Sequence, residues 1–272
     1  MPIASTAIVH PGARIDPTAV IGDYCIIEAD VEIGAHCRLD PFVVVKRYTT
    51  MGSYNHLYSG AQVGTDPLDK KFDEKQATYL RIGNHNVLRE YLTISRGTAP
   101  GSATEIGDHN YVMTNVHIAH NCRIGDHNTI CSNCLIAGHV YMEDHCFLSG
   151  AVLVHQFGRI GRLSMISGNV RCNLDVPPFL TVSEFNVTAR GLNLVGLRRC
   201  GMKPEQIGAL KRAYRLLYRS RLPLEEALER IEAEVATPEA LHMVEFIRSS
   251  ERGICRDRAD SDTARGAADS AD

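Results

Sequence analysis

The chain has 272 residues, of which 44% are hydrophobic, so it is long enough to bury a substantial core and is not expected to be disordered. Its formal net charge of -3 provides no overall basic field, which argues against nucleic acid as a partner. The N-terminus lacks the basic and apolar regions of a signal peptide, and no run of about eighteen apolar residues predicts a transmembrane segment. These features predict a soluble, cytoplasmic protein.

Aliphatic residues recur every six positions. The first run consists of Val9, Ile15, Ile21, Ile27, Ile33, Leu39, Val45, Met51, Leu57 and Val63. After interruptions at 65–78 and 97–102, the longest run consists of Ile106, Val112, Ile118, Ile124, Ile130, Ile136, Met142, Leu148, Val154, Ile160 and Ile166. A spacing of six fits neither a simple strand nor a helix. It is typical of a parallel β-helix, in which three hexads close one triangular coil of about 18 residues and the aliphatic residues fill the interior.

Nine cysteines raise the question of disulfides or a metal site. Five of them lie two positions before an interior residue: Cys25, Cys37, Cys122, Cys134 and Cys146. A free cysteine behaves as a small hydrophobe, so we expect these five to fill space near tight corners. The positions one coil away hold other residues, which argues against stacked disulfides. Cys131 and Cys134 lack the second pair of ligands that a zinc finger requires.

The six-residue pattern ends after Pro178 and becomes helical. Predicted helices begin at Pro204, at Pro223 and, after Thr237 as N-cap, at Pro238. The predicted organisation is a β-helix domain over 1–185, a helical domain over 186–255 and a disordered tail, rich in Ala, Asp and Ser, over 256–272.

Two histidines, His117 and His120, stand three residues apart within the strictest part of the repeat. With the two interruptions and the helical end, the chain resembles the bacterial UDP-N-acetylglucosamine O-acyltransferase family over about residues 1–255. The segments that carry the resemblance are Val116 to Cys122, Ile136-Ala137-Gly138-His139, Val154-His155-Gln156-Phe157, Asp175-Val176-Pro177-Pro178 and Gly196-Leu197-Arg198-Arg199. The resemblance implies a mostly β protein, with a left-handed parallel β-helix of hexapeptide repeats followed by a C-terminal α-helical domain.

Members of this family transfer a 3-hydroxyacyl chain from acyl carrier protein to the 3-hydroxyl of UDP-N-acetylglucosamine, the first step of lipid A biosynthesis. By resemblance, His120 is the general base, a role that suits an imidazole because its ordinary pKa is about 6.5. The backbone N–H of Gly138 is the oxyanion donor, and Gly168 is the acyl-chain-length position. The resemblance places substrate contacts at Asp69, Lys71, His117, His139, His155, Gln156, Asn193 and Arg199. It implies no metal or other cofactor.

Asp69 and Lys71 lie on the first interruption and, by resemblance, reach the sugar nucleotide from a neighbouring subunit. A site shared in this way requires an oligomer, and the resemblance implies a homotrimer. Independently of the resemblance, His120, His139 and His155 are 19 and 16 residues apart, close to one coil, so we expect them along one side of the β-helix.

The sequence departs from the family pattern at several positions. Asn121 follows the predicted base where the family often has an aspartate as the orienting partner. Leu68, Asn186, Val195 and Cys200 stand where better-known members usually carry glutamine, histidine, glutamate and arginine. Acyl transfer to a different amino sugar nucleotide therefore remains an alternative, as does a catalytically silent paralogue that only binds sugar nucleotides or carrier protein.

A zinc lyase of the carbonic anhydrase type is a further alternative, because such enzymes also use hexapeptide coils and three histidine ligands. The remaining corner histidines are interpreted as structural: His36, His56, His85, His109, His127 and His145. The basic residues of the predicted helices are either a solvated surface or a binding surface for an acidic carrier protein. Together with Arg190, Arg198 and Arg199 just before these helices, the set consists of Lys211, Arg212, Arg215, Arg219 and Arg221.

Overall fold

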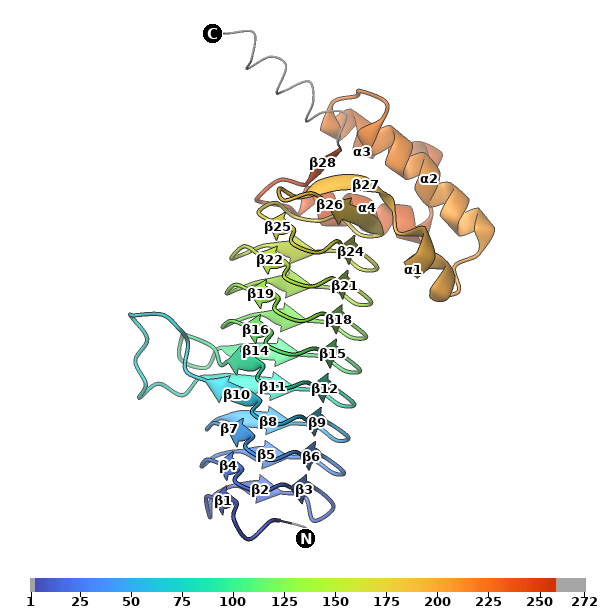
Figure 1. The fold of residues 1–272 in the computed structure, drawn as a ribbon. Helices are drawn as coiled ribbons and strands as arrows, with labels where there is room; N and C mark the ends of the chain where they lie inside the picture. Colours follow the sequence, from blue (N-terminus) through green and yellow to red (C-terminus); the bar gives the residue numbers. More distant parts are fainter. Residues whose placement is uncertain (1–2, 258–272) are drawn as a thin grey trace.

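Short parallel strands wind into a triangular prism in this computed structural model, which describes residues 3–257 (Figure 1). We call its three sheets faces A, B and C. Face B contains β1 (Ile8–Val9), β4 (Ile26–Ile27), β7 (Val44–Val45), β10 (Gln62–Thr65), β13 (Thr93–Ser95), β16 (His117–Ile118), β19 (Leu135–Ile136), β22 (Leu153–Val154) and β25 (Arg171–Cys172). Face C contains β2 (Arg14–Ile15), β5 (Glu32–Ile33), β8 (Thr49–Met51), β11 (Tyr79–Ile82), β14 (Ala103–Ile106), β17 (Arg123–Ile124), β20 (Tyr141–Met142) and β23 (Arg159–Ile160). Face A contains β3 (Val20–Ile21), β6 (Arg38–Leu39), β9 (His56–Leu57), β12 (Val87–Leu88), β15 (Tyr111–Val112), β18 (Thr129–Ile130), β21 (Phe147–Leu148), β24 (Met165–Ile166), β26 (Leu180–Ser183), β27 (Thr188–Leu192) and β28 (Arg256–Asp257).

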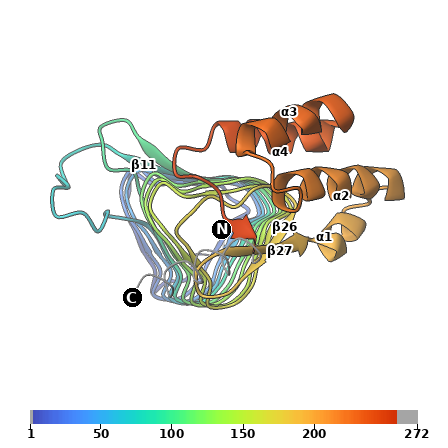
Figure 2. The same cartoon turned by 90° about the horizontal axis from the view of Figure 1, so that it is seen from above.

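The six-residue pattern places one side chain of each strand inside the prism and its neighbour outside. In β16, for example, Ile118 is fully buried, whereas His117 is half-buried and faces outward. Ile118 pairs with Ile136 of the next coil, so aliphatic side chains form continuous ladders within the prism. The predicted interior pattern is confirmed from Ile21 onwards, while Val9 and Ile15, in the first coil, are only partly buried. The coils wind left-handed, as predicted, which the two orthogonal views show (Figures 1 and 2).

The corners of the prism repeat one backbone conformation. Most turns from Tyr24 onward carry a residue in the left-handed region, which is usually costly outside glycine but tolerated best by asparagine and aspartate; Asn121 has φ 59° and His139 also has φ 59°. At the corner between faces C and A the rings of His85, His109, His127 and His145 stack with centroids 4.7 Å apart. These four histidines are therefore structural parts of a corner.

Buried asparagines connect successive coils beneath the same corner. The backbone N–H of Asn86 donates to Oδ1 of Asn55 (2.9 Å), and the N–H of Asn110 donates to Oδ1 of Asn86 (2.8 Å). Asn128 continues the ladder in the same way. Each side chain supplies the acceptor that a buried amide of the next coil needs, since burial removes water as an alternative partner.

All nine cysteines are free thiols. The five in the predicted corner positions are buried, and the Sγ of Cys122, for example, donates to the carbonyl oxygen of Ala137 at 3.1 Å. Burial raises the pKa of Cys122 to about 12, so this thiol stays neutral and unreactive. The prediction that these cysteines fill space near the corners is confirmed.

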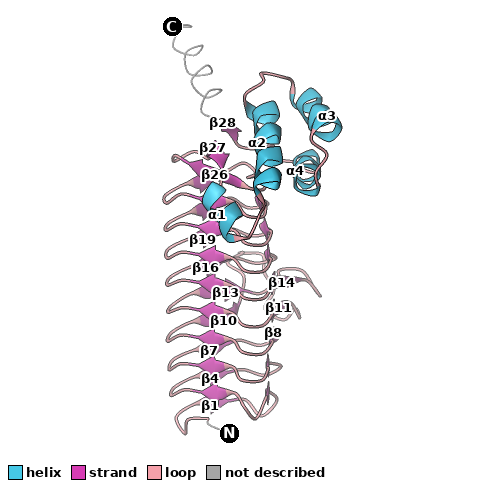
Figure 3. Ribbon diagram, turned by 90° about the vertical axis from the view of Figure 1, so that its right-hand side faces the viewer, coloured by secondary structure: helices cyan, strands magenta, loops and turns pink. Residues whose placement is uncertain are grey.

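The four helices of residues 3–257 gather at the C-terminal end of the prism (Figure 3). They are α1 (Leu194–Arg199), α2 (Pro204–Tyr218), α3 (Leu224–Glu234) and α4 (Pro238–Arg248). The predicted starts at Pro204 and Pro238 are confirmed, and Pro223 is the N-cap residue of α3. The short helix α1 was not predicted. Within the described residues, none of the helices has the length and the apolar run needed to cross a membrane.

The helices pack on a second apolar core that includes Phe179 and Phe246. Figure 2 shows α3 and α4 beside face C, α1 and α2 at the corner between faces C and A, and the long loop at the corner between faces B and C. Of the predicted disordered tail, Arg256–Asp257 form β28, which pairs with β27, and residues 258–272 lie outside the described residues.

The hydrogen bonds of the asparagine ladder should stabilise the fold. We expect Asn86→Ala to lower the free energy of unfolding by about 1–3 kcal/mol, because the buried N–H of Asn110 then has no acceptor. The control is Glu229→Ala on the exposed surface of α3, where alanine suits the helix; its cost should stay within about 0.5 kcal/mol. Denaturant unfolding measures both, and equal losses would contradict a stabilising role for the ladder.

Candidate active site

The corner between faces B and C, here called the B/C edge, carries most of the predicted catalytic residues. Three successive coils place His120, Gly138 and Gln156 at one turn position and Asn121, His139 and Phe157 at the next. The predicted column of histidines is therefore offset by one residue. The rings of His120 and His139 meet edge to face at 5.2 Å, and His139 stacks on Phe157 at 4.7 Å.

The geometry around His120 determines which ring nitrogen carries the proton. Its Nδ1 lies 3.0 Å from Oδ1 of Asn121. An amide oxygen can only accept, so Nδ1 must be the donor, and Nε2 of the neutral ring is left with a free lone pair. A half-buried imidazole with a free Nε2 is the arrangement that a general base requires.

Gly138 leaves room for that ring. A Cβ atom built at position 138 would lie 2.7 Å from Nε2 of His120, a separation that real side chains do not adopt, so a larger residue would displace the imidazole. The N–H of Gly138 donates no hydrogen bond to any other residue in the described range 3–257. A free backbone N–H on the residue that packs against the imidazole is suited to act as an oxyanion donor.

Two neutral imidazoles border His120. Burial and, secondarily, the nearby charge of His120 lower the pKa of His117 and of His139 below 6.5. A hydrogen bond of 2.7 Å connects Nδ1 of His117 to Oγ1 of Thr93. At neutral pH both rings are therefore uncharged donors and acceptors, which suits contacts to sugar hydroxyls and to an acyl group. His155 is more exposed, and its Nδ1–H donates to the carbonyl oxygen of Gln156 (3.0 Å).

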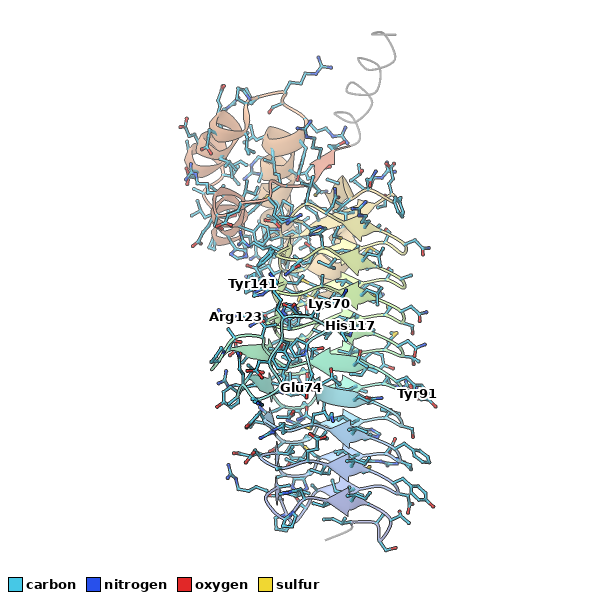
Figure 4. The ribbon with its side chains drawn as sticks, turned by 90° about the vertical axis from the view of Figure 1, so that its left-hand side faces the viewer. Lys70, Glu74, Tyr91, His117, Arg123 and Tyr141 are labelled. Atoms are coloured by element: carbon cyan, nitrogen blue, oxygen red, sulfur yellow. The ribbon has the colours of Figure 1, made fainter. Side chains whose placement is uncertain are left out.

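The first interruption, residues 65–78, begins at the last residue of β10, and residues 66–78 form a loop that projects from the B/C edge. In Figure 4, which faces this loop, Lys70 lies near the level of His117 and Glu74 lies lower, whereas Tyr91 lies at the right-hand edge of the prism. Asp69 and Lys71 are exposed on the loop, where the N–H of Lys71 donates to Oδ1 of Asp69. Neither contacts His120 within one chain.

Sequence reasoning missed the residue that anchors this loop. Arg96 is 1% exposed and donates to Oδ1 of Asp66 (2.7 Å) and to the carbonyl oxygen of Gln76 (3.1 Å). Its guanidinium also lies 5.0 Å from the ring of Phe72. A buried charge needs such partners. Only the position of an arginine directly before the second interruption hinted at this role, and the sequence does not say where that arginine points.

The remaining predicted residues lie on the other two edges of the prism. Asn193 is the N-cap of α1: its Oδ1 accepts from the N–H of Gly196 and its Nδ2 donates to the carbonyl oxygen of Leu163. With Arg199 it borders a cavity of about 670 Å³ at the corner between faces C and A, the C/A edge. Gly168 lies at the corner between faces A and B. One chain therefore divides the predicted site among three edges.

Comparisons with known proteins identify the family. A family model described as Udp N-acetylglucosamine O-acyltransferase, Domain 2, matches residues 175–255, and one described as bacterial transferase hexapeptide (six repeats) matches residues 103–138. The acyl-[acyl-carrier-protein]--UDP-N-acetylglucosamine O-acyltransferase of Thermodesulfovibrio yellowstonii is 43% identical, over 93% of this chain and 99% of that protein. The chain belongs to the UDP-N-acetylglucosamine O-acyltransferase family. Its predicted membership is confirmed.

Solved structures of this acyltransferase family share the fold. The UDP-N-acetylglucosamine acyltransferase of Francisella novicida matches with a TM-score of 0.91 and 36% identity, covering 95% of each chain. The enzyme of Moraxella catarrhalis matches with a TM-score of 0.91 and 40% identity, covering 94% of this chain and all of the other. The left-handed β-helix with a helical C-terminal end, predicted from the repeat and the resemblance, is thereby confirmed.

The lyase alternative requires three ligands that converge on one metal ion. Among residues 3–257, no group of three or more histidine, cysteine, aspartate or glutamate side chains is arranged to hold one. The histidines of the B/C edge are instead held by neighbouring side chains and by each other. This arrangement and the family membership leave the lyase without support.

The coupling between the three imidazoles predicts a measurable change in pKa. We expect His120→Gln to raise the pKa of both His117 and His139, because it removes the positive charge that disfavours their protonated forms. Both should stay below 6.5, because burial is the larger cause and remains. NMR titration of the ring carbons measures the shifts. His145 is the control: burial and His127 lower its pKa, so it should not respond.

Proposed function

We propose that this acyltransferase moves a 3-hydroxyacyl chain from acyl carrier protein to the 3-hydroxyl of UDP-N-acetylglucosamine, the first step of lipid A biosynthesis. The names of its relatives state the donor and the acceptor. The observation that carries the mechanism is the free Nε2 of His120, held beside the free N–H of Gly138. No cofactor is required, because the thioester is already activated.

The reaction follows from this geometry. Nε2 of His120 takes the proton of the sugar 3-hydroxyl as that oxygen attacks the thioester carbonyl. The N–H of Gly138 donates to the oxyanion that forms on the carbonyl oxygen. When the intermediate collapses, the carbon–sulfur bond breaks, and the protonated imidazole returns its proton to the departing thiolate of the carrier. His117, His139, His155 and Gln156 hold the sugar and the acyl group.

The outer surfaces of the three faces differ in a way that supports a homotrimer. Face C presents charged side chains in ion pairs, such as Arg81 with Glu105 at 3.1 Å. Face B instead exposes Leu135 and Leu153, and face A exposes Phe147. Apolar surfaces of this kind are typical of subunit contacts. Two unlike apolar faces on one prism favour a head-to-tail ring, in which face B of one protomer packs on face A of the next.

In such a ring, predicted site residues that lie on different edges of one chain come together at each subunit interface. If faces A and B meet around a threefold axis, the outer rim of each interface brings the B/C edge of one protomer to the C/A edge of the next. His120 then lies opposite the cavity bordered by Asn193 and Arg199, which suits the nucleotide end of the acceptor. Asp69 and Lys71, on the projecting loop, reach toward the neighbour. Gly168, at the edge between the two packed faces, leaves room for a long acyl chain.

The nucleotide cavity also carries the departures from the family pattern. Val195 and Cys200 border it in place of the usual glutamate and arginine. Arg199 is exposed there and keeps a positive charge available to a diphosphate. UDP-N-acetylglucosamine and its 3-amino analogue both carry this diphosphate, so the choice of UDP-N-acetylglucosamine as the acceptor rests on the names of the relatives.

The carrier protein is the proposed partner of the helical end. Lys211, Arg212 and Arg215 are exposed along α2 and make no ion pair with another residue of the described range. An unpaired basic surface of this kind complements an acidic carrier and accelerates association by electrostatic steering.

A transfer assay with 3-hydroxyacyl carrier proteins tests the function. The wild-type protein should acylate UDP-N-acetylglucosamine in preference to its 3-amino analogue, and His120→Ala should lower kcat by about 100- to 10,000-fold. His36→Asn, at an exposed corner far from the site, should retain activity within about twofold. Product that survives His120→Ala would exclude His120 as the base, and exclusive use of the 3-amino analogue would reassign the acceptor.

Light scattering tests the assembly. At micromolar concentration the protein should have about three times the mass of the 30.0 kDa chain. Leu153→Asp places a charge on face B and should dissociate the trimer, because the charge would lose its hydration in the interface. Tyr141→Asp, at a similarly exposed position on face C, should leave the mass unchanged. A monomeric wild-type protein would refute the shared site.

A further inference from the structure

Thr98, in the second interruption, lies against the residue that orients the catalytic histidine. Its backbone N–H is 3.2 Å from Oδ1 of Asn121, and its hydroxyl Oγ1 is 2.8 Å from the same atom. A backbone N–H can only donate, so the end of the Asn121 side chain that faces Thr98 must be the carbonyl oxygen and not the NH₂ group.

The same oxygen accepts the Nδ1–H of His120, at 3.0 Å. It therefore has three donors: two from Thr98 and one from the imidazole. With Nδ1 protonated, Nε2 keeps its lone pair. The orientation of the Asn121 amide therefore determines the tautomer of His120.

An amide differs from a carboxylate in this position. Both oxygens of an aspartate accept, so its rotation by 180° leaves the neighbouring imidazole unchanged. If the Asn121 amide rotated in the same way, its NH₂ group would face Nδ1 of His120. Nδ1 would then have to accept, the proton would sit on Nε2, and that nitrogen could no longer take a proton from the sugar. An asparagine at 121 therefore needs a neighbour that distinguishes its two ends.

A neighbour that fixes the orientation of the Asn121 amide must itself be rigid, and Thr98 is rigidly held. It follows Arg96, which is buried under the projecting loop, and Gly97, where an added Cβ would lie 2.6 Å from the carbonyl oxygen of Ser102. Beyond it, the N–H of Ser102 donates to the carbonyl oxygen of Ala99 and closes a tight turn. The backbone on both sides of Thr98 is thus constrained.

We propose that Thr98 is a positioning residue: by holding Oδ1 of Asn121, it keeps the proton of His120 on Nδ1 and leaves Nε2 free to act as the base. The catalytic part of this inference rests on the proposed function, whereas the tautomer part does not. Thr98 touches neither the reacting atoms nor the imidazole in this role.

The test compares Thr98→Val with Thr98→Ser. Valine has the same shape and keeps the backbone N–H but removes the hydroxyl donor. We expect Thr98→Val to lower kcat by up to about fivefold with KM nearly unchanged, because a lost hydrogen bond of about 1 kcal/mol lets the amide populate the rotated state. Serine restores the donor and should bring kcat back to within about twofold of the wild type. Nitrogen-15 NMR of the His120 ring should show the proton partly transferred to Nε2 in Thr98→Val only.

A double substitution separates positioning from a merely structural effect. In an Asn121→Asp background both ends of the side chain accept, so adding Thr98→Val should change kcat by less than about twofold. An equal loss in the wild-type and Asn121→Asp backgrounds would overturn the inference, as would an unchanged tautomer in Thr98→Val. If the wild type transferred no acyl group but Thr98→Val still shifted the ring proton, the proposed function would fail and the control of the tautomer would stand.

Discussion

The structure depends on the hydrogen bonds that stack one coil on the next in parallel register. Because residues 18 positions apart pair across coils, as His117 does with Leu135, every side chain has equivalents directly above and below it. The interior becomes continuous ladders of aliphatic residues, and each outer edge becomes a column. Reactive side chains therefore lie mainly at the edges, because a turn residue can differ from its equivalents in neighbouring coils without disturbing the core.

The B/C edge shows how the scaffold accommodates a reactive group. His120 fits there only because the next coil has glycine at position 138, and its neighbours are two imidazoles whose pKa values are lowered, so they stay neutral beside it. The two insertions act at the same edge. One projects as a loop held by the buried Arg96, and the other brings Thr98 to Asn121. Their placement at one corner brings the loop that carries Asp69 next to the segment that contacts Asn121 beside His120.

Dividing the proposed site among three edges has a structural consequence. The prism is too stiff to bend, because each face is a continuous ladder of hydrogen bonds. Its three edges therefore stay apart within one chain. Residues on different edges can share a ligand only when a second prism supplies the missing edge. The apolar outer surfaces of faces A and B and the charged surface of face C make such an arrangement physically reasonable, and they explain why a single chain shows the pieces of a site apart from one another.

The sequence by itself determined the periodic part of this protein. A six-residue spacing allows one inward and one outward residue per short strand, so the β-helix, its buried ladder, the role of Cys122 and the corner location of His120 all follow from counting. Proline and threonine signals likewise located the starts of α2 and α4. The resemblance then supplied the roles of the edge residues. The short helix α1, whose N-cap is Asn193, carried no periodic signal and was missed.

Only the tertiary structure decided how the irregular segments fold back onto the coils. Spacings of 19 and 16 placed His139 and His155 on the right edge but not in register with His120, because register is set by backbone pairing and not by residue type. Nothing in the order of residues shows that Arg96 is buried or that Thr98 meets Asn121. Those contacts join segments from different coils, and their geometry depends on where two insertions settle against a surface that exists only after the prism has formed.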